Sequence, residues 1–135
     1  MRKLMHRMFK TGFRVMRAGL EQFGLTPGQF GVLDELHQCD GLTLNALAER
    51  MHGDAPTICG FVEGTVQAGF VERRADPTDR RRLNLYLTPK ALAEWPNLAA
   101  VEAHCTEVLM SRLTDNERQQ FIHLLSRING VDLGE

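Results

Sequence analysis

The spacing of apolar residues changes at Gly69, and this change limits the folds open to the chain. Before Gly69, apolar residues recur at the intervals of an α-helix. After it, Leu83, Leu85 and Leu87 alternate with polar residues, which is the pattern of a half-buried β-strand. The residues Asp76-Pro77-Thr78-Asp79 supply a turn just before that strand. The sequence therefore predicts an arginine-rich β-hairpin within an otherwise helical chain.

Four helices are predicted before the hairpin. The first covers about residues 2–22 and ends at Gly24. The second follows Thr26-Pro27-Gly28-Gln29, which has the hydroxyl and the glutamine of a capping box. The third covers residues 44–51 and the fourth residues 55–68, so only three residues separate them. Two short helices this close together form a helix-turn-helix.

Two further helices are predicted after the hairpin. The first starts near Pro89 and is expected to break or bend at Trp95-Pro96, because proline removes a backbone hydrogen bond. The second begins after a capping box at residues 114–117 and stops at Asn129-Gly130. The fold class is therefore mainly α with a small β-hairpin. We expect one domain with a winged helix-turn-helix core, residues 25–89, flanked by helices in residues 1–24 and 90–135.

The two ends of the chain predict a homodimer. Both are amphipathic, and a terminal helix on so small a domain leaves part of its apolar stripe exposed. A second copy of the chain buries such stripes in a symmetric interface. We therefore interpret residues 1–24 and 90–135 as dimerisation helices.

Charge is distributed very unevenly along the chain. The formal net charge is only −1, which argues against a polycation that coats nucleic acid. Residues 1–20, however, carry six bases and no acid, and residues 73–82 carry five arginines against two aspartates. The remainder is strongly acidic. A nucleic-acid interaction must therefore depend on the local basic segments.

Composition also excludes several classes of function. No apolar run is long enough to span a bilayer, and the acid-free N-terminus continues a helical stripe to Phe23 rather than ending at a cleavage site as a transit peptide would. The three cysteines form no CxxC pair, which favours a reducing compartment and predicts a cytoplasmic protein. His37 with Cys39, and His104 with Cys105, lack metal-ligand spacing, so we expect neither metal nor cofactor. Without a nucleophile-base pair or a phosphate loop, an enzyme is not expected.

The hairpin resembles the wing signature of the MarR family of transcriptional regulators. Arg73 is followed by Asp76, Asp79 and Arg81, and the second strand ends in Leu87-Thr88. The resemblance implies a homodimer whose winged helix-turn-helix binds a pseudo-palindromic operator in double-stranded DNA. Repression or activation depends on where the operator lies, and we expect repression by occlusion. The resemblance covers most of the chain, since residues 25–27, 42–51 and 69–73 are similar to the family as well.

The chain departs from the family pattern at its recognition helix, residues 55–68. The family often carries arginines there, where this chain has Gly60 and Gly64. Between Met51 and Glu72 there is no Lys or Arg, so bidentate recognition of guanine by this helix is excluded. A second, smaller departure is Ala91, where the family has a closing glycine. Base recognition by the helix is therefore expected to be weak.

The wing is expected to compensate for the neutral helix. Arg81 is our candidate for insertion into the minor groove, where narrow A·T-rich tracts attract arginine. On the family resemblance, Asp79 pairs with Arg81 and, with Asp76, braces the wing. The other arginines are expected to contact phosphates or to pair with Asp76 and Glu72. The predicted DNA-binding residues are Thr43, Asn45, Pro56, Thr57, Cys59, Gly60, Arg73, Arg74, Arg80, Arg81 and Arg82.

Family members release DNA when a small aromatic acid binds or a cysteine is oxidised. For such an effector we predict a pocket of Phe9, Phe13, Phe30 and His37, although aromatic stripes at helical spacing more often form core. Cys59 lies on the recognition helix, where a small structural residue is the alternative to a redox site. The neutral helix also keeps a second function open, a winged-helix protein-interaction module without specific DNA binding.

Overall fold

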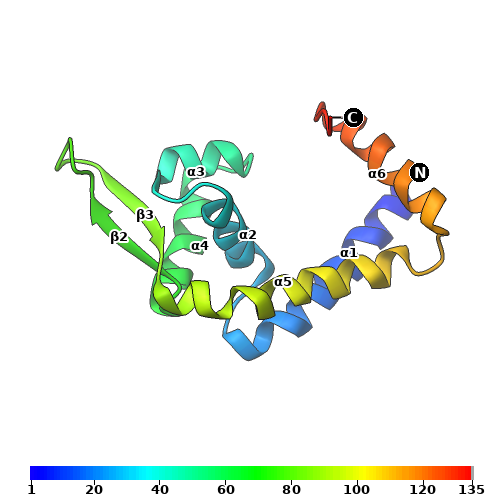
Figure 1. Ribbon diagram of the computed structural model, residues 1–135, viewed down its shortest axis with the longest axis horizontal. Coiled ribbons are helices and arrows are strands. Elements are labelled where there is room, and N and C mark those ends of the chain that lie inside the picture. The colour runs from blue at the N-terminus through cyan, green and yellow to red at the C-terminus, as the bar shows by residue number, and fades with distance from the viewer. Residues whose placement is uncertain (135) are drawn as a thin grey trace.

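The computed structural model describes residues 1–134 and has two parts (Figure 1). A lobe contains α2, α3, α4 and a small sheet, and an arm contains α1 beside α5, with α6 at the far end. This confirms the fold class predicted from the sequence. The elements are α1 (Arg2–Leu20), a 3₁₀ turn (Glu21–Phe23), α2 (Pro27–Gln38), β1 (Leu42–Thr43), α3 (Leu44–Arg50), α4 (Ala55–Gln67), β2 (Val71–Ala75), β3 (Leu83–Leu87), α5 (Pro89–Met110) and α6 (Asp115–Ile128).

Side-chain caps set where the helices begin. Thr26 and Thr114 form the two predicted capping boxes, in which the threonine accepts from the backbone three residues on and the Gln29 or Glu117 side chain accepts from the capping residue. Thr43 and Asp54 cap α3 and α4 without a capping box, each accepting one backbone N–H in the first turn. Local sequence thus determines the starts of these four helices.

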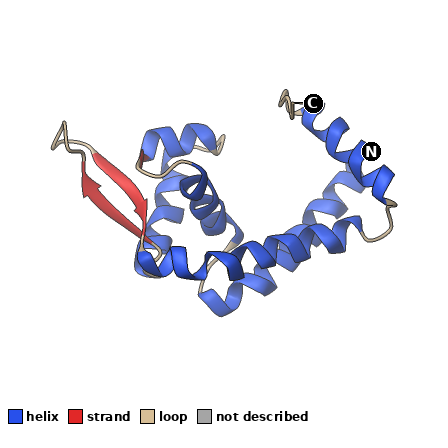
Figure 2. Ribbon diagram, in the orientation of Figure 1, coloured by secondary structure: helices blue, strands red, loops and turns tan. Residues whose placement is uncertain are grey.

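The sheet has three strands, in the order β1-β3-β2, where the sequence predicts only a hairpin (Figure 2). The extra strand, β1, is two residues long and pairs Leu42 with Leu85 and Thr43 with Asn84. A segment this short carries no alternating pattern, so the sequence offers no signal for it. Its pairing holds the start of α3 against the base of the wing.

Helix α5 continues through Pro96, so of the two predicted outcomes at this position, a break or a bend, the break is wrong. Proline costs the helix one backbone hydrogen bond. Ala91 lies before the proline, Leu98 and Val101 lie after it, and all three are buried on the face toward the rest of the molecule. Burial on both sides of Pro96 keeps the helix continuous despite the lost bond.

Two glycines let α1 lie very close to α5. Gly12 is buried, and its carbonyl oxygen lies 3.5 Å from the Cys105 Sγ. A Cβ added at Gly19 would lie 2.5 Å from Cγ1 of Val101, closer than atoms can approach without movement. The arm is therefore a tightly packed helix pair that extends from the lobe.

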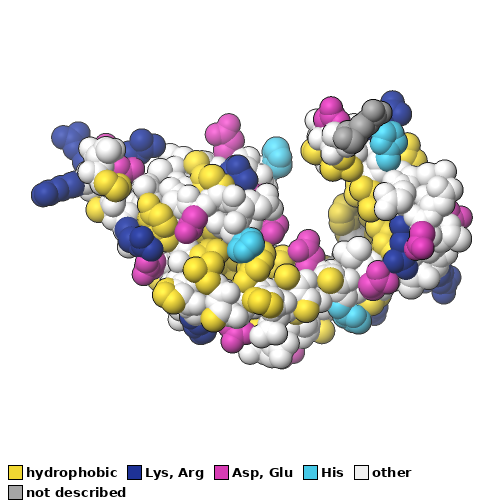
Figure 3. Space-filling view, viewed as in Figure 1, with side chains coloured by type: hydrophobic (Ala, Val, Ile, Leu, Met, Phe, Trp, Pro, Cys, Tyr) yellow, Lys and Arg dark blue, Asp and Glu magenta, His cyan; other side chains and the backbone are white. Residues whose placement is uncertain are grey.

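The far end of the arm exposes apolar side chains (Figure 3). Helix α6 has no buried residue, and Ile128 is 81% exposed. On α1, Phe9 is 64% exposed. No helix within residues 1–134 is long and apolar enough to cross a membrane. The other large apolar side chains exposed on these elements are Leu4, Met5, Phe13, Ile122, Leu124 and Leu125.

Candidate DNA-binding surface

Helix α4 is fixed in the lobe by close packing against α2. Ile58, Val62 and Thr65 face inward and are buried, and the Thr65 hydroxyl donates to the Val62 carbonyl at 2.6 Å. A Cβ added at Gly28 of α2 would overlap the Phe61 ring. The inner side of α4 is therefore committed to the core, and its opposite side faces solvent.

We call the exposed residues Pro56, Thr57, Gly60, Glu63 and Gln67 the outward face of α4. From Thr57 onward they recur three or four positions apart, as one side of a helix requires, and Pro56 lies four positions before Gly60. Of the residues predicted to touch DNA from α4, Pro56, Thr57 and Gly60 lie on this face. Cys59, the fourth, is half-buried beside it. Predictions for α3 fall close by, since Thr43 caps that helix and Asn45 is exposed in its first turn.

The hydroxyl of Thr57 is already engaged by the cap of its own helix. The Asp54 carboxylate accepts the Thr57 backbone N–H at 2.8 Å and the Thr57 Oγ1 hydrogen at 2.9 Å. These two hydrogen bonds lower the pKa of Asp54, so its carboxylate stays ionised at neutral pH. Thr57 therefore has its methyl group, rather than a free hydroxyl donor, to offer outward.

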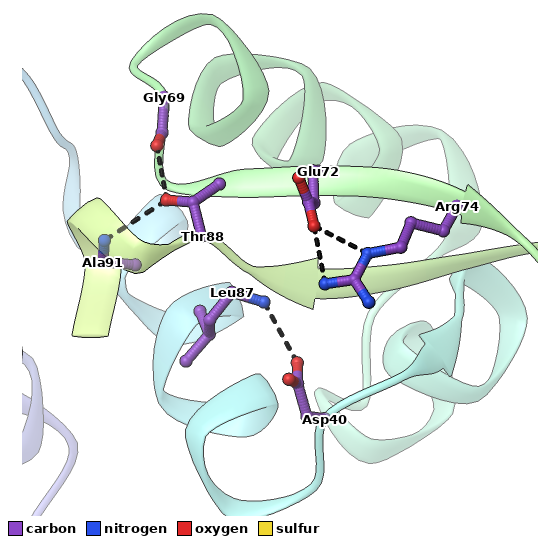
Figure 4. A network of polar contacts seen from close by, with 7 residues as sticks. All are labelled: Asp40, Gly69, Glu72, Arg74, Leu87, Thr88 and Ala91. Carbon is purple, nitrogen blue, oxygen red and sulfur yellow. Dashed lines mark hydrogen bonds and ion pairs between the residues drawn. The ribbon is translucent and has the colours of Figure 1, made fainter.

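At the base of the wing, two arginines are held by glutamates. Arg73 pairs with Glu63 of α4, and not with Asp76 or Glu72 as the sequence led us to expect. Arg74 pairs with Glu72 at 2.6 Å (Figure 4). The guanidinium carbon of Arg74 also lies 4.1 Å from the centroid of the Tyr86 ring. Both charges are partly neutralised by these surface ion pairs. They are less available to phosphate than arginines without such partners.

The turn of the wing is organised by Asp76. Its carboxylate accepts the Thr78 hydroxyl at 2.7 Å, the Thr78 N–H at 2.8 Å and the Asn84 Nδ2 at 3.0 Å. These hydrogen bonds, the Thr78 hydroxyl first among them, hold the pKa of Asp76 well below its usual range. Asn84 is buried beneath this turn, although the alternating pattern placed the leucines, and not Asn84, on the inner side. Leu83 is instead 53% exposed.

Asp79 contacts Arg81 through the backbone and not through the guanidinium. Its Oδ1 accepts the Arg81 N–H at 3.0 Å, and no ion pair joins the two side chains in the part of the chain described. The expected Asp79–Arg81 ion pair is therefore wrong for this structure. Two residues apart in a tight turn, a carboxylate reaches the following backbone N–H more easily than the side chain beyond it.

Three arginines of the wing remain without an ion-pair partner among residues 1–134, and all lie at its tip: Arg80, Arg81 and Arg82. All three are exposed. Figure 3 shows basic side chains extending from this tip into solvent. The wing arginines that have no carboxylate partner within the described residues are therefore concentrated at the end of the hairpin.

The base of the wing is tied to three neighbouring segments (Figure 4). Asp40 accepts the Leu87 N–H at 3.0 Å, which joins the loop after α2 to β3. The Thr88 hydroxyl donates to the Gly69 carbonyl at 2.6 Å and accepts the Ala91 N–H at 3.2 Å. Ala91 is fully buried, so alanine fits where the family pattern has glycine. The wing tip is therefore presented on a firmly attached stem.

The four residues predicted to form an effector pocket do not line one cavity within the described chain. Phe9 and Phe13 lie on α1 at an open hollow of about 980 Å³ that also includes Leu109. Phe30 and His37 lie on α2 and stack on Trp95 of α5, with ring centroids 6.0 and 3.9 Å away. The sequence gives helical spacing within α1 and within α2, but not the distance between the two helices.

The three cysteines are free thiols and differ in exposure. Cys39 is exposed, Cys59 is half-buried and Cys105 is buried. Burial, and then the nearby Glu102 carboxylate, raises the pKa of the Cys105 thiol. No group of three or more His, Cys, Asp or Glu side chains in residues 1–134 is arranged to hold a metal ion.

Comparison with known proteins gives a consistent result. The sequence model of the MarR family matches residues 25–83. A transcriptional regulatory protein named for the hcr operon of Thauera aromatica is 33% identical over 109 residues, which are 81% of this chain and 66% of that protein. The chain thus spans about two thirds of that relative's length.

Solved structures agree with this result over nearly the whole chain. A MarR transcriptional regulator from Methanosarcina mazei Go1 is 25% identical, with a TM-score of 0.88 over 95% of this chain and 92% of the other. The fold also matches a cysteine-to-serine mutant of MarR from E. coli in complex with operator DNA, at 24% identity and a TM-score of 0.83 over 93% of this chain and 91% of the other.

Proposed function

Because this chain belongs to the MarR family of transcriptional regulators, we propose that it is a sequence-specific repressor that binds a pseudo-palindromic operator as a homodimer. The observation that carries the proposal is the concentration of unpaired arginines at the wing tip, Arg80, Arg81 and Arg82, on a hairpin whose base is joined to the exposed face of α4 by the Arg73–Glu63 pair. A helix in the major groove with a basic hairpin in the adjacent minor groove is a geometry that double-stranded DNA accepts.

The proposed homodimer is supported by the apolar surface at the far end of the arm. Helix α6 has no buried residue in one chain, and its Leu124 and Ile128 are largely exposed. Exposed apolar patches of this kind mark interfaces. A two-fold pair of chains would carry two lobes, which suits half-sites about one helical turn, ~10 bp, apart. The arm thereby sets the spacing of the operator.

Within this proposal the wing supplies most of the electrostatic attraction. Arg73 and Arg74 have carboxylate partners, so phosphate contacts depend chiefly on the tip. Arg81 is our choice for the minor groove, where sequence preference arises from groove width rather than from base edges. Thr43 and Asn45, at the start of α3, would then lie toward the phosphate backbone.

We further propose that a small aromatic acid releases the repressor. The hollow beside Phe9 and Phe13 has an apolar floor, and Arg7, Lys10 and Arg14 lie around it. This combination suits an aromatic ring with a carboxylate. Oxidation of Cys59, beside the outward face of α4, is the alternative trigger. We place the protein in the cytoplasm, where three free cysteines stay reduced, and assign it no enzymatic reaction.

A second candidate function is a winged-helix module for protein assembly. The observation in its favour is the recognition helix, which carries no Lys or Arg and whose Glu63 is already paired with Arg73. Such a module would bind DNA only through general charge attraction, without preference for sequence.

The experiment that separates these functions is selection of bound duplexes from random DNA, followed by a footprint on the selected sequence. A repressor of the proposed kind enriches an inverted repeat and protects both half-sites. Repeating the binding with benzoate-type acids and with peroxide tests release. Failure to enrich any sequence, with binding that simply weakens as salt rises, would favour the assembly module.

A further inference from the structure

The fold does not explain Gly60, which lies in the middle of α4. Glycine is among the least favourable residues in a helix interior, and alanine is the most favourable. A Cβ added at Gly60 would meet no heavy atom within 4 Å. Gly60 lies within α4 and does not have a positive φ, so alanine could adopt the same backbone conformation. The chain thus keeps a destabilising residue where its own structure has room for a better one.

Other helical glycines of the lobe show the contrast. A Cβ at Gly28 would overlap the Phe61 ring, and one at Gly64 would overlap Nε2 of Gln29. Both positions require a residue without a side chain, because a side chain of the neighbouring helix lies against them. Gly60 has no such neighbour and lies on the outward face of α4. We therefore seek the reason for this glycine in a surface outside the chain that approaches the helix closely.

The chemistry around Gly60 indicates what that surface presents. Pro56 lies one turn earlier and is exposed, and Thr57 has its hydroxyl bound to Asp54, which leaves its methyl group. Glu63, one turn later, is paired with Arg73. Close to Gly60, the outward face therefore has no free cationic side chain that could donate to guanine. The groups it exposes there for contact are mainly apolar carbon atoms. The apolar group that a major groove displays is the C5-methyl of thymine.

We propose that the outward face of α4 seats a thymine methyl group in the shallow space over Gly60, between Pro56 and Thr57. This inference rests on the proposed function, because it requires α4 to lie in the major groove of an operator. It makes Gly60 a specificity-determining residue. Each operator half-site then carries an A·T pair at the base pair that faces Gly60.

The test replaces thymine by deoxyuridine, which lacks only the methyl group, at one position at a time in the selected operator. Burial of one methyl corresponds to about fourfold in affinity, so symmetrical replacement in both half-sites should weaken binding about fifteenfold. Replacement at thymines whose only approach to the protein is the wing should have little effect, because the methyl lies in the opposite groove.

A Gly60→Ala variant completes a cycle with the same duplexes. We expect it to melt at the same or a higher temperature than the wild type, since alanine favours the helix and meets no neighbour. It should bind the thymine operator at least about fifteenfold less tightly, the factor that loss of both methyl contacts gives, and lose its discrimination against deoxyuridine. Cycles of this kind isolate the pairwise contact from other effects of each change.

Three results would overturn the inference. Equal affinity for thymine and deoxyuridine at every position, in a protein that does retard the operator, would leave the proposed function standing and remove the methyl contact. If Gly60→Ala bound the operator with wild-type affinity, the proposed function would stand but Gly60 would not be a specificity-determining residue. Absence of any selected sequence would overturn both this inference and the proposed function, and so distinguishes the two failures.

Discussion

The five arginines of the wing divide into two groups by their partners. Arg73 and Arg74 form ion pairs with Glu63 and Glu72, whereas the three at the tip have no such partner in residues 1–134. An arginine that must first leave a carboxylate gives up part of what it gains from phosphate. Counting arginines along the sequence therefore overstates the charge available to DNA at the stem of the wing.

At this scale we predict that Arg81→Ala weakens operator binding at least tenfold and makes it less dependent on salt. Each lost phosphate contact should reduce the slope of log affinity against log salt by about 0.9. Mobility-shift titrations from 50 to 200 mM salt measure both quantities. Arg112→Ala is the matched control, since Arg112 is also exposed and also without an ion-pair partner among the described residues, but lies between α5 and α6. Equal slopes for Arg81→Ala and the wild type would remove the wing tip from the mechanism.

Sequence reasoning reaches some residues of this surface and not others. The arginines, Asp76 and the turn are visible because turn chemistry is local. The pairing of Arg73 with Glu63 is not, because it depends on how β2 leaves the end of α4. Burial of Asn84 is hidden for a similar reason, since it follows from a hydrogen bond to Asp76 across the hairpin. Contacts between residues that are distant in the sequence can be identified only from the three-dimensional structure.

Among the elements, α2 and α4 are packed closely against each other in the lobe. Gly28 lies against the Phe61 ring, and the Gln29 side chain both caps α2 and covers Gly64. The helix-turn-helix is therefore held by backbone-to-side-chain proximity as well as by its apolar core. Enlarging one of these glycines should move α4 relative to α2.

We predict that Gly28→Ala destabilises the protein by about 1–3 kcal/mol through overpacking against Phe61. Chemical denaturation at fixed protein concentration measures this free energy of unfolding. Gly60→Ala is the matched control, because the same change on the outward face meets open space and should not destabilise. Equal stability of Gly28→Ala and the wild type would show that the ring moves aside without cost.

The contact between α2 and α5 should make stability depend on pH. Partial burial raises the pKa of Glu102 on α5, and the Asp34 carboxylate on α2 adds to the rise. A carboxyl with a raised pKa costs nothing below its unfolded value, near 4.3, where it is neutral in both states. As pH rises through the folded pKa, ionisation in the folded protein becomes unfavourable and stability falls.

We therefore predict that Glu102→Gln raises the melting temperature at pH 7 and leaves it unchanged at pH 4, where the wild-type carboxyl is largely protonated. Asp34→Asn should give a smaller rise at pH 7, since it removes only the like charge. Thermal unfolding at the two pH values makes the comparison. An equal rise at both pH values would assign the effect to packing instead of ionisation.

The sequence predicts an element correctly when the interactions that form it are between residues close together in the sequence. Capping boxes at Thr26 and Thr114 involve three or four neighbouring residues, and both helix starts are correctly predicted. Strand β1 exists only because it pairs with β3, about forty residues away, and it was missed. Helix α5 continues past Pro96 because of burial that no local rule includes.

At the scale of the whole molecule, the lobe and the arm differ in how their apolar surfaces are buried. The lobe has a closed core formed by α2, α3, α4 and the sheet, with the start of α5 packed against it. The arm closes only where α1 crosses α5, and beyond that crossing α6 has no buried residue. An apolar surface of this extent is stable in water when a second copy covers it. Quaternary structure is therefore expected to complete the arm and leave the lobe independent.

The corresponding prediction concerns Ile128, which is 81% exposed at the end of α6. Ile128→Glu should convert the proposed dimer to monomer, because a carboxylate in an apolar interface must be desolvated without a partner. The lobe should keep its helical content, since Ile128 contributes nothing to its core. Operator affinity should fall by at least a hundredfold, because two linked lobes bind two half-sites far more tightly than one lobe binds one.

Sedimentation, circular dichroism and mobility shifts with full and half operators measure the three effects of Ile128→Glu. Leu92→Glu is the matched control, since Leu92 is 56% exposed on α5 but lies near the lobe. It should remain dimeric. If Ile128→Glu also sediments as a dimer and binds the full operator normally, the two chains meet elsewhere, and α6 must serve a different partner. A monomer that binds half and full operators equally would instead confirm that the arm's role is to hold two lobes at one fixed spacing.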